Sequence, residues 1–320
     1  MLLDDPEHTD RPEHPLVLDG AARDLVTFGS GSLVVASGAV VAAVSADGRL
    51  ATIEHRETIG GRSTRFDGPE SRDDDPASSL IGRPLAGGFR DAVRIAFPAE
   101  FSAGTPLALL LDDLPVASLI SGYARLYQGA IPADAARQSM QSDICSGWRE
   151  SGTMMLSVRA GAGVPVTVGP RAPSIADETE DDALGWHTIG ALPVGAMRRR
   201  RLVDVRLADD EWEVFAMFRD THVDQAGTET VLHEYTLTAT VDAATAVFTA
   251  CAAVPRVLPW PECPVAAASA DRLVGVPATL VRERVRADLR GTSTCTHLND
   301  LLRSLGDVAS LAATAHATFG

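Results

Sequence analysis

Apolar residues follow two different periods in the C-terminal half of the chain, and each period predicts one kind of element. The i, i+3, i+4, i+7 spacing that buries one face of a helix occurs at Leu298, Leu301, Leu302 and Leu305. Alternation of apolar and polar residues over 231–241 predicts a strand with one apolar face. Further strands at 198–205, 212–219 and 246–254 complete a predicted four-stranded antiparallel sheet.

The N-terminal half shows the same sequence of patterns in weaker form. Short strands rich in Val and Leu are predicted at 24–28, 32–36, 39–45 and 49–54, and Asp47-Gly48 is a hairpin turn signal between the last two. The polar stretch 56–79 predicts a loop, and helical patterns follow at 89–97 and 105–119. Beyond them, 120–140 has a helical pattern and 153–158 is predicted to be a strand.

Motifs of the two halves recur in the same order. LIGRP from Leu80 is matched by LVGVP from Leu273, FRDAVR from Phe89 by VRERVR from Val281, and TPLALLLDDL from Thr105 by a similar stretch at 296–305. Chance similarity between two leucine-rich helices is the alternative explanation, and the shared L-x-G-x-P and the common order argue against it. The sequence therefore predicts an α+β fold with an internal duplication, in which two similar lobes each place an antiparallel sheet before helices.

Four segments follow from this organisation. A tail at 1–20, rich in Asp, Glu, Pro and His, is expected to be disordered, and an N-terminal lobe spans 21–125 as a degenerate copy. A connector with an acidic, flexible link at 170–184 spans 126–195. The C-terminal lobe at 196–320 is expected to carry the site.

Composition limits the partners and the compartment. With 43 acidic and 28 basic side chains the net charge is -15, so nucleic acid or an anionic membrane surface is not expected as a general partner. No stretch approaches the ~18 consecutive apolar residues of a membrane helix. Four cysteines without a C-x-x-C pair fit free thiols in a cytoplasmic protein. A small-molecule ligand is the expected partner, and a homodimer remains open.

Cys295 and His297 are the first candidates for chemistry, because they lie where the leucine-striped helix begins. Ser293, Thr294 or Thr296 could each act as its N-cap. The positive end of the helix favours anions, so a thiol there is expected to ionise more easily. The alternative is that Cys295 is a small buried apolar residue and His297 a polar residue on the surface. The first copy has Gly104 and Pro106 at the matching positions, so only the second lobe has this pair.

Three more segments of the C-terminal half supply candidates. On the strand at 231–241, His233 and Tyr235 share the apolar face, so His233 is predicted to point inward and to need a hydrogen-bond partner. The proline-rich loop at 255–264 presents Trp260, Glu262 and Cys263, and Trp260 could also fill the core. The four arginines at 198–201 are predicted to lie two on each face of a strand. A solvated strand edge is the favoured explanation, and recognition of a carboxylate or phosphate the alternative.

These C-terminal motifs resemble a bacterial family of unknown function, the domain-of-unknown-function family 2889. The resemblance covers 197–311 and rests on a His followed by an acid, on Cys-Pro, and on a Gly-Cys-Thr-His-Leu segment. These motifs fall on His233-Glu234, Cys263-Pro264 and 294–298, where Thr294 replaces the glycine. The N-terminal half is similar to an extension found in actinobacterial relatives. The resemblance implies a site at the same side chains and supplies no reaction.

Three functions are compatible with these residues. We expect an enzyme without a cofactor, a hydrolase, hydratase or lyase, that uses Cys/His acid–base chemistry on a small apolar carboxylate, ester or thioester. Its expected catalytic residues are His233, Cys295, His297, Cys263, Glu262 and Asp220. Its expected substrate-binding residues are Tyr235, Trp260 and Arg200. The alternatives are a zinc protein and a non-catalytic binding module. Zinc would be held by Cys263, Cys295, His297 and His233, although C-x-H is not a common zinc spacing.

Overall fold

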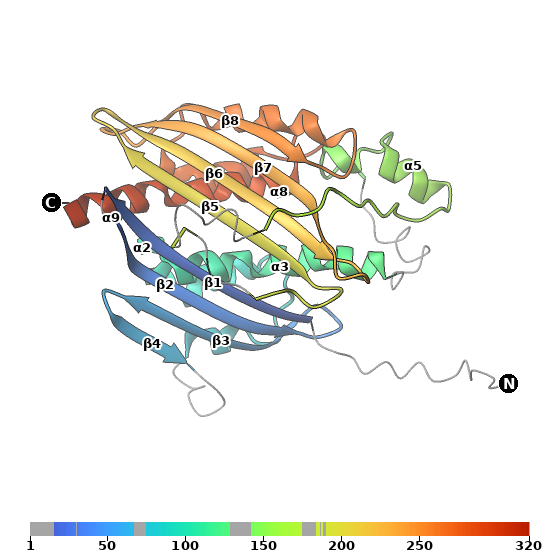
Figure 1. Cartoon of the computed structure of the whole chain (residues 1–320), viewed down its shortest axis with the longest axis horizontal. Coiled ribbons are helices and arrows are strands. Elements are labelled where there is room, and N and C mark those ends of the chain that lie inside the picture. The colour runs from blue at the N-terminus through green and yellow to red at the C-terminus, as the bar shows by residue number, and fades with distance from the viewer. Residues whose placement is uncertain are drawn as a thin grey trace. The chain divides into compact units, whose positions relative to one another are not determined.

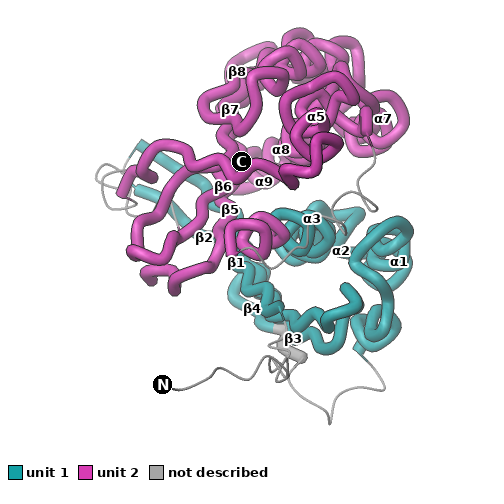
Figure 2. The backbone as a smooth tube through the Cα atoms, turned by 90° about the vertical axis from the view of Figure 1, so that its right-hand side faces the viewer, with its two compact units in different colours: residues 1–120 teal, residues 121–320 magenta. Residues whose placement is uncertain are grey.

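The computed structural model describes residues 16–29, 31–66, 75–128, 142–174, 184–185, 187 and 190–319. The chain divides into two compact units, residues 1–120 and 121–320, coloured separately in Figure 2. The boundary lies close to the end of the N-terminal lobe predicted at 125, and the connector belongs to the second unit. Strand β1 begins at Leu16, inside the predicted tail at 1–20, and the first fifteen residues lie outside the described ones.

The first unit places a sheet before its helices (Figure 1). The sheet is antiparallel, in the order β1 (Leu16–Phe28), β2 (Gly31–Val44), β3 (Leu50–Ile59) and β4 (Arg62–Phe66). After it come the 3-10 helix η2 (Pro76–Leu80), α1 (Phe89–Ala96), α2 (Pro98–Ala103) and the start of α3 (Pro106–Tyr127). Their apolar faces share one core, which includes Leu50, Phe89, Phe97 and Leu111.

The second unit repeats that plan. Its sheet is antiparallel in the order β5 (Met197–Leu207), β6 (Glu211–Val223), β7 (Glu229–Asp242) and β8 (Phe248–Val257), as predicted. Among the described residues of this unit, the end of α3 and two short helices precede the sheet, η3 (Ser146–Trp148) and α5 (Thr153–Arg159). Six follow it: η4 (Cys263–Leu273), η5 (Ala278–Leu280), α7 (Val281–Asp288), α8 (Thr296–Ser304), η6 (Leu305–Asp307) and α9 (Val308–Phe319). The α+β class with two lobes is confirmed.

The same backbone connection joins sheet to helices in both units. Leu50 begins β3 and exchanges two backbone hydrogen bonds with the turn that carries Gly82, whose N–H lies 2.8 Å from the carbonyl oxygen of Leu50. Phe248 begins β8 and makes the same two bonds with the turn of Gly275, again at 2.8 Å. The glycines have φ of 78° and 82°, which disfavours any other residue. The repeated L-x-G-x-P therefore forms the same turn, bonded to the start of a strand, in both lobes.

The predicted apolar stripe and the predicted apolar strand face pack against each other. On β7, Tyr235, Leu237 and Val241 are buried, and the intervening Thr238 is exposed. The opposing helices contribute leucines that are fully buried. These are Leu298, Leu301, Leu302 and Leu305. At ~2 kcal/mol for each buried large apolar side chain, this contact fixes α8 against the sheet and hence the place of its first residues.

Two predictions about the first unit are corrected. The strands predicted at 32–36 and 39–45 form one strand, β2, because Gly38 continues it. A Cβ at Gly38 would lie 2.8 Å from the backbone nitrogen of Leu107, so the glycine allows β2 and the start of α3 to approach closely. The loop predicted at 56–79 also contains the end of β3 and all of β4. Polar side chains hide these strands from a hydropathy pattern, since β4 lies at the sheet edge.

A third correction concerns 153–158, which forms helix α5 and not a strand. Oε1 of Glu262 accepts hydrogen bonds from the N–H of Thr153 at 2.8 Å and from its hydroxyl at 2.9 Å. The helix start therefore obtains its acceptor from a residue 109 positions later, which local propensity cannot reveal. Met154 and Val158 fill a small separate core with Trp260.

Helix α3 joins two segments that were predicted separately. It runs through Pro115 to Tyr127 without a break, and the remainder of the helical pattern at 129–140 lies outside the described residues. Among the described residues it is the one helix long and apolar enough to cross a membrane by length and composition. Core helices of soluble proteins meet the same criterion, so its length assigns no membrane contact.

Gly38→Ala tests the close approach of β2 and α3. We expect it to destabilise the protein by about 1–3 kcal/mol, because the new methyl group meets backbone atoms that cannot rotate away. Urea unfolding followed by circular dichroism measures the change. The control is Gly122→Ala in α3, where a Cβ meets nothing within 4 Å and where alanine should raise stability by up to about 1 kcal/mol. Equal unfolding midpoints for the two variants would contradict the packing described.

Candidate functional site

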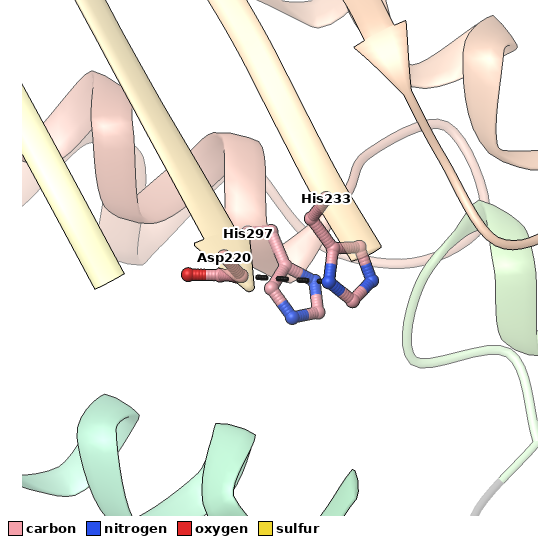
Figure 3. Close-up of side chains that lie close together, drawn as sticks. All are labelled: Asp220, His233 and His297. Atoms are coloured by element: carbon pink, nitrogen blue, oxygen red, sulfur yellow. Dashed lines mark ion pairs between the residues drawn. The ribbon is translucent and has the colours of Figure 1, made fainter. Parts of the chain in front are cut away.

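Three of the predicted side chains meet in the second unit. Asp220, His233 and His297 each offer a ligand atom, and these atoms all lie within 4.8 Å of one another. Figure 3 shows the two imidazole rings stacked beside the carboxylate. The ring centroids are 3.8 Å apart with an interplanar angle of 17°, and Nδ1 of His233 lies 3.6 Å from Oδ2 of Asp220. Side chains 64 residues apart along the chain are thus in van der Waals contact.

The strand register and the helix start explain this meeting. Asp220 on β6 and His233 on β7 are register partners, and the pairing shifts by one residue directly after Asp220. His297 is the second residue of α8, whose N-cap is Cys295 and whose leucine stripe lies on the same sheet face. The helix-start position of His297 is confirmed, and His233 lies half-buried on the strand face covered by α8, as predicted. The hydrogen-bond partner predicted for His233 is not present at Nδ1, which has none among the described residues.

Arg199 holds the carboxylate in place from the neighbouring strand. Its Nε and Nη2 donate to the two oxygens of Asp220, both at 2.7 Å, and its Nη1 donates to Asp300 on α8. The guanidinium also lies over the ring of Phe218, 4.9 Å from the centroid. Because both oxygens of Asp220 already accept from Arg199, the carboxylate is fixed in orientation before any ligand arrives.

The arginine run is not a solvated edge. Arg198 and Arg200 lie on one face of β5, Arg199 and Arg201 on the other, as the alternation predicts. Strand β5 does lie at the edge of the sheet, but side-chain exposure is 8% for both Arg199 and Arg201, so the predicted solvation of these side chains is wrong. Asp300 lies 3.6 Å from Arg201, and these acidic partners make burial of the guanidinium groups tolerable.

Both imidazoles are held in the neutral form. Burial, assisted by the positive charge of Arg199 and opposed by Asp300, lowers the pKa of His297 to about 3. Burial also lowers the pKa of His233 well below its ordinary value, and His297 and Arg199 act in the same direction against Asp220. A neutral imidazole offers one nitrogen lone pair and one N–H, which suits a base, a hydrogen-bond donor or a metal ligand.

The cysteines behave differently from the prediction. Cys295 caps α8, yet burial raises the pKa of its thiol to about 11 in spite of the hydrogen bonds from the helix N–H groups. Burial likewise raises the pKa of Cys263 to about 12. The expected ease of ionisation at the helix start is wrong, because the loss of hydration destabilises the thiolate more than the N–H groups and dipole of the helix stabilise it. Both thiols, with Cys145, surround the buried hydroxyl of Tyr235.

The remaining predicted residues lie apart from the imidazoles or serve the fold. Glu262 accepts hydrogen bonds at the start of α5, and Trp260 packs in the small core of that helix. Tyr235 neighbours Cys295 and stacks on Phe218, 5.9 Å between centroids. Arg200 lies on the face of β5 opposite to Arg199. Nothing in the structure contradicts a functional role for these four, and none of them contacts the imidazole rings through a described hydrogen bond.

Sequence reasoning did not identify Arg199, Asp300 or Cys145 as site residues. The alternation of the arginine run gives a signal for Arg199, since it places this side chain on the apolar face of a strand, where an acid must accompany it. Asp300 lies three residues after His297, next to the leucine stripe, and is 7% exposed. No pattern in the sequence marks Cys145, which reaches the site from a loop more than a hundred residues away along the chain.

The first unit has the same strand pairing and register shift as the site, but no histidines at the matching positions. Asp24 on β1 pairs with Ala36 on β2, and the register shifts directly after Asp24, as it does after Asp220. The position matching His233 is thus alanine, and that matching His297 is Pro106. Among the described residues, the three-residue group with ligand atoms this close occurs in the second unit alone.

The comparisons with known proteins give one match. Neither the curated proteins nor the solved structures contain a significant match to this chain. Residues 197–311 match the model of a family described as "Protein of unknown function (DUF2889)", and this stretch runs from the first residue of β5 into α9. The part of the C-terminal lobe that carries Asp220, His233 and His297 is therefore similar to this family.

Proposed function

We propose that the C-terminal lobe is an enzyme that works without a cofactor, by general acid–base chemistry, on a small apolar carboxylate, ester or thioester. The observation that carries the proposal is the pair formed by His233 and Asp220, whose Nδ1 and Oδ2 lie 3.6 Å apart. His233 is neutral and its side chain is 17% exposed, so a small ligand can reach a ring that a buried carboxylate orients.

His233 is the base in this proposal. Nδ1 lies 3.6 Å from Asp220 and has no hydrogen-bond partner among the described residues, so this proposal requires the contact to shorten when a ligand binds. Nδ1–H then donates to Asp220, and Nε2 presents its lone pair to a substrate or to a water molecule. When the ring takes a proton, the carboxylate stabilises the imidazolium that forms. Arg199 prevents Asp220 from turning away, because it occupies both oxygens from the adjacent strand.

His297 has a different role, although its ring is stacked on that of His233. Burial lowers the pKa of both rings, to about 3 for His297, but of the two only His233 has a described carboxylate oxygen within 4 Å that can stabilise its imidazolium. Its neutral ring can instead donate a hydrogen bond to a carbonyl oxygen on which negative charge develops. One imidazole accepting and one donating provide the two functions that hydration or hydrolysis of an ester or thioester requires.

The thiols are excluded from the role of nucleophile in this proposal. A thiol with a pKa of about 11 is ionised in about one molecule in 10,000 at pH 7. Cys295 is also 4% exposed and Cys263 6% exposed, so a substrate does not reach the sulfur atoms without a rearrangement. The proposed reaction therefore uses an activated water molecule or direct proton transfer, with no acyl-enzyme.

A metal-binding function is the second candidate, because the carboxylate and two imidazoles converge within 4.8 Å. This donor set suits zinc, but it is not the set predicted from the sequence, since the cysteines do not belong to the group. Two features weigh against a metal ion. Arg199 occupies both oxygens of Asp220, and nearly parallel stacked rings direct their lone pairs side by side and not towards one point.

His233→Gln and Cys295→Ala distinguish acid–base catalysis by an imidazole from nucleophilic catalysis by a thiol. We expect His233→Gln to lower turnover at least 100-fold, because the base is lost, and Cys295→Ala to stay within ten-fold of the wild type. Short-chain nitrophenyl esters, acyl thioesters and unsaturated acids, followed by absorbance and NMR, form the substrate panel. His316→Gln, at an exposed position of α9, is the matched control. Loss of turnover in Cys295→Ala comparable to that in His233→Gln would overturn the acid–base assignment.

The neutral state of His297 predicts a pH dependence of stability. Its folded-state pKa of about 3 lies below the ordinary value of 6.5, so the unfolded chain binds more protons between these values. Stability should therefore fall as the pH falls below 6.5, by about 1.4 kcal/mol per pH unit for this histidine. Urea unfolding between pH 8 and pH 5 measures the slope. His297→Gln should make it shallower and His316→Gln should leave it unchanged; equal slopes in all three proteins would contradict a neutral His297.

Zinc titration decides between the two candidate functions. We expect wild-type protein, purified without a polyhistidine tag, to bind zinc more weakly than micromolar, because a cation must displace Arg199 from Asp220. Competition with a chelating dye gives the dissociation constant. A one-to-one complex of nanomolar affinity that His297→Gln abolishes and His316→Gln retains would establish the metal-binding function instead.

A further inference from the structure

We propose that Asp300 is a positioning residue for the two stacked imidazoles, because it holds the pair of Arg199 and Asp220 in place against helix α8. The inference rests on the acid–base function proposed above and adds the residue that couples the helix to the base. Asp300 lies three residues after His297, so one turn of α8 carries both a ring of the stack and the carboxylate that binds Arg199. Asp300 is 7% exposed, so it acts through other side chains and does not contact a substrate.

The contacts that include Asp300 form a closed ring. Asp220 lies beside His233 and accepts two hydrogen bonds from Arg199. Arg199 also donates to Asp300, which lies on the same face of α8 as His297. His297 is stacked on His233 with 3.8 Å between the ring centroids, so the contacts return to their starting point (Figure 3). A displacement of any member is therefore opposed from two sides, and Asp300 supplies a polar link between the strands and the helix.

Two further arginines fix Asp300 itself. Its Oδ2, which accepts from Arg199, also lies 3.6 Å from Nη2 of Arg201 on β5. Its Oδ1 lies 3.7 Å from Nη1 of Arg303, one turn later on α8. Because both oxygens are engaged by guanidinium groups, the carboxylate has little freedom to turn. The position at which it holds Nη1 of Arg199 is therefore fixed.

A role as counter-charge alone is the alternative for Asp300. Neutralisation of buried guanidinium groups depends on the charge of a neighbour and only weakly on its direction. Direction is what the structure shows, since Arg199 uses Nε and Nη2 on Asp220 and directs Nη1 at Asp300. A planar fork bound at two of its edges cannot rotate, and this sets where the oxygens of Asp220 lie relative to His233.

Two substitutions of Asp300 distinguish these roles in the full chain. Both Asp300→Ala and Asp300→Asn lose the negative charge, but asparagine keeps an acceptor oxygen for Nη1 of Arg199. With the substrate of the panel that the wild type turns over fastest, we expect Asp300→Ala to lower kcat about 10- to 100-fold, because the base is misplaced. KM should change less than about three-fold, and Asp300→Asn should recover most of kcat, because the hydrogen bond to Nη1 is kept.

The imidazole protons give a second readout that needs no substrate. Protons of stacked rings carry ring-current shifts in their NMR signals, and these shifts depend on the geometry of the stack. His233→Gln and His297→Gln assign the signals. We expect Asp300→Ala to move both sets of signals towards their positions in the unfolded chain, and Asp300→Asn to move them less. If the wild type turns over no substrate of the panel, the proposed function fails, and the NMR signals still decide the role of Asp300.

Asp307→Ala is the matched control. Oδ2 of Asp307 lies 2.6 Å from Nη2 of Arg282, and the aspartate side chain is 13% exposed, so this variant also breaks a largely buried carboxylate–arginine pair. It should lower the unfolding midpoint and leave the imidazole signals and kcat unchanged. Asp300→Leu, which removes the acceptor without leaving a cavity, replaces Asp300→Ala if alanine prevents folding. Imidazole signals that stay in place in the variant without the acceptor, or move equally in that variant and in Asp300→Asn, would overturn the proposal.

Discussion

The contact between Arg199 and Asp220 is the constraint on which the second lobe depends. Arg199 reaches both oxygens of Asp220 on the next strand and also Asp300 on α8, so one guanidinium joins two strands and a helix. The three charges are nearly inaccessible to water, and each would be costly alone. Removing the arginine would leave two buried carboxylates side by side. The same contact orients the carboxylate that faces His233, so fold and site share one interaction.

Burial decides the ionisation of every reactive group near that contact. A helix start favours a thiolate, yet desolvation raises the pKa of Cys295 to about 11. The same cause lowers the pKa of His297 to about 3. Both effects favour the neutral form, in one group by keeping a proton and in the other by excluding it. The lobe thus holds neutral thiols and neutral imidazoles around a charged pair, and the accessible reactive group is the imidazole.

The sequence predicted the fold where local pattern and tertiary packing agree. The alternation on β7 and the leucine stripe of α8 are each visible locally, and they cover one another in the structure. Thr153 to Arg159 were mispredicted because Glu262, far along the chain, supplies the acceptor for that helix. His233 and His297 were identified from residue type. Alternation along the arginine run can place Arg199 on the apolar face, but its pairing with Asp220 depends on a strand register that no local pattern contains.

Comparison of the two lobes distinguishes the residues that the fold requires from those that only a function would require. Asp24 keeps the position of Asp220, including the register shift that follows it, in a lobe with alanine and proline at the imidazole positions. An aspartate at this position of the strand pair therefore does not require a neighbouring histidine. Two histidines on separate elements are not required by the frame, since the first lobe folds without them. Stacked, half-buried and kept neutral, they carry a desolvation cost that small apolar residues would avoid, and this cost is best explained by a function of the second lobe.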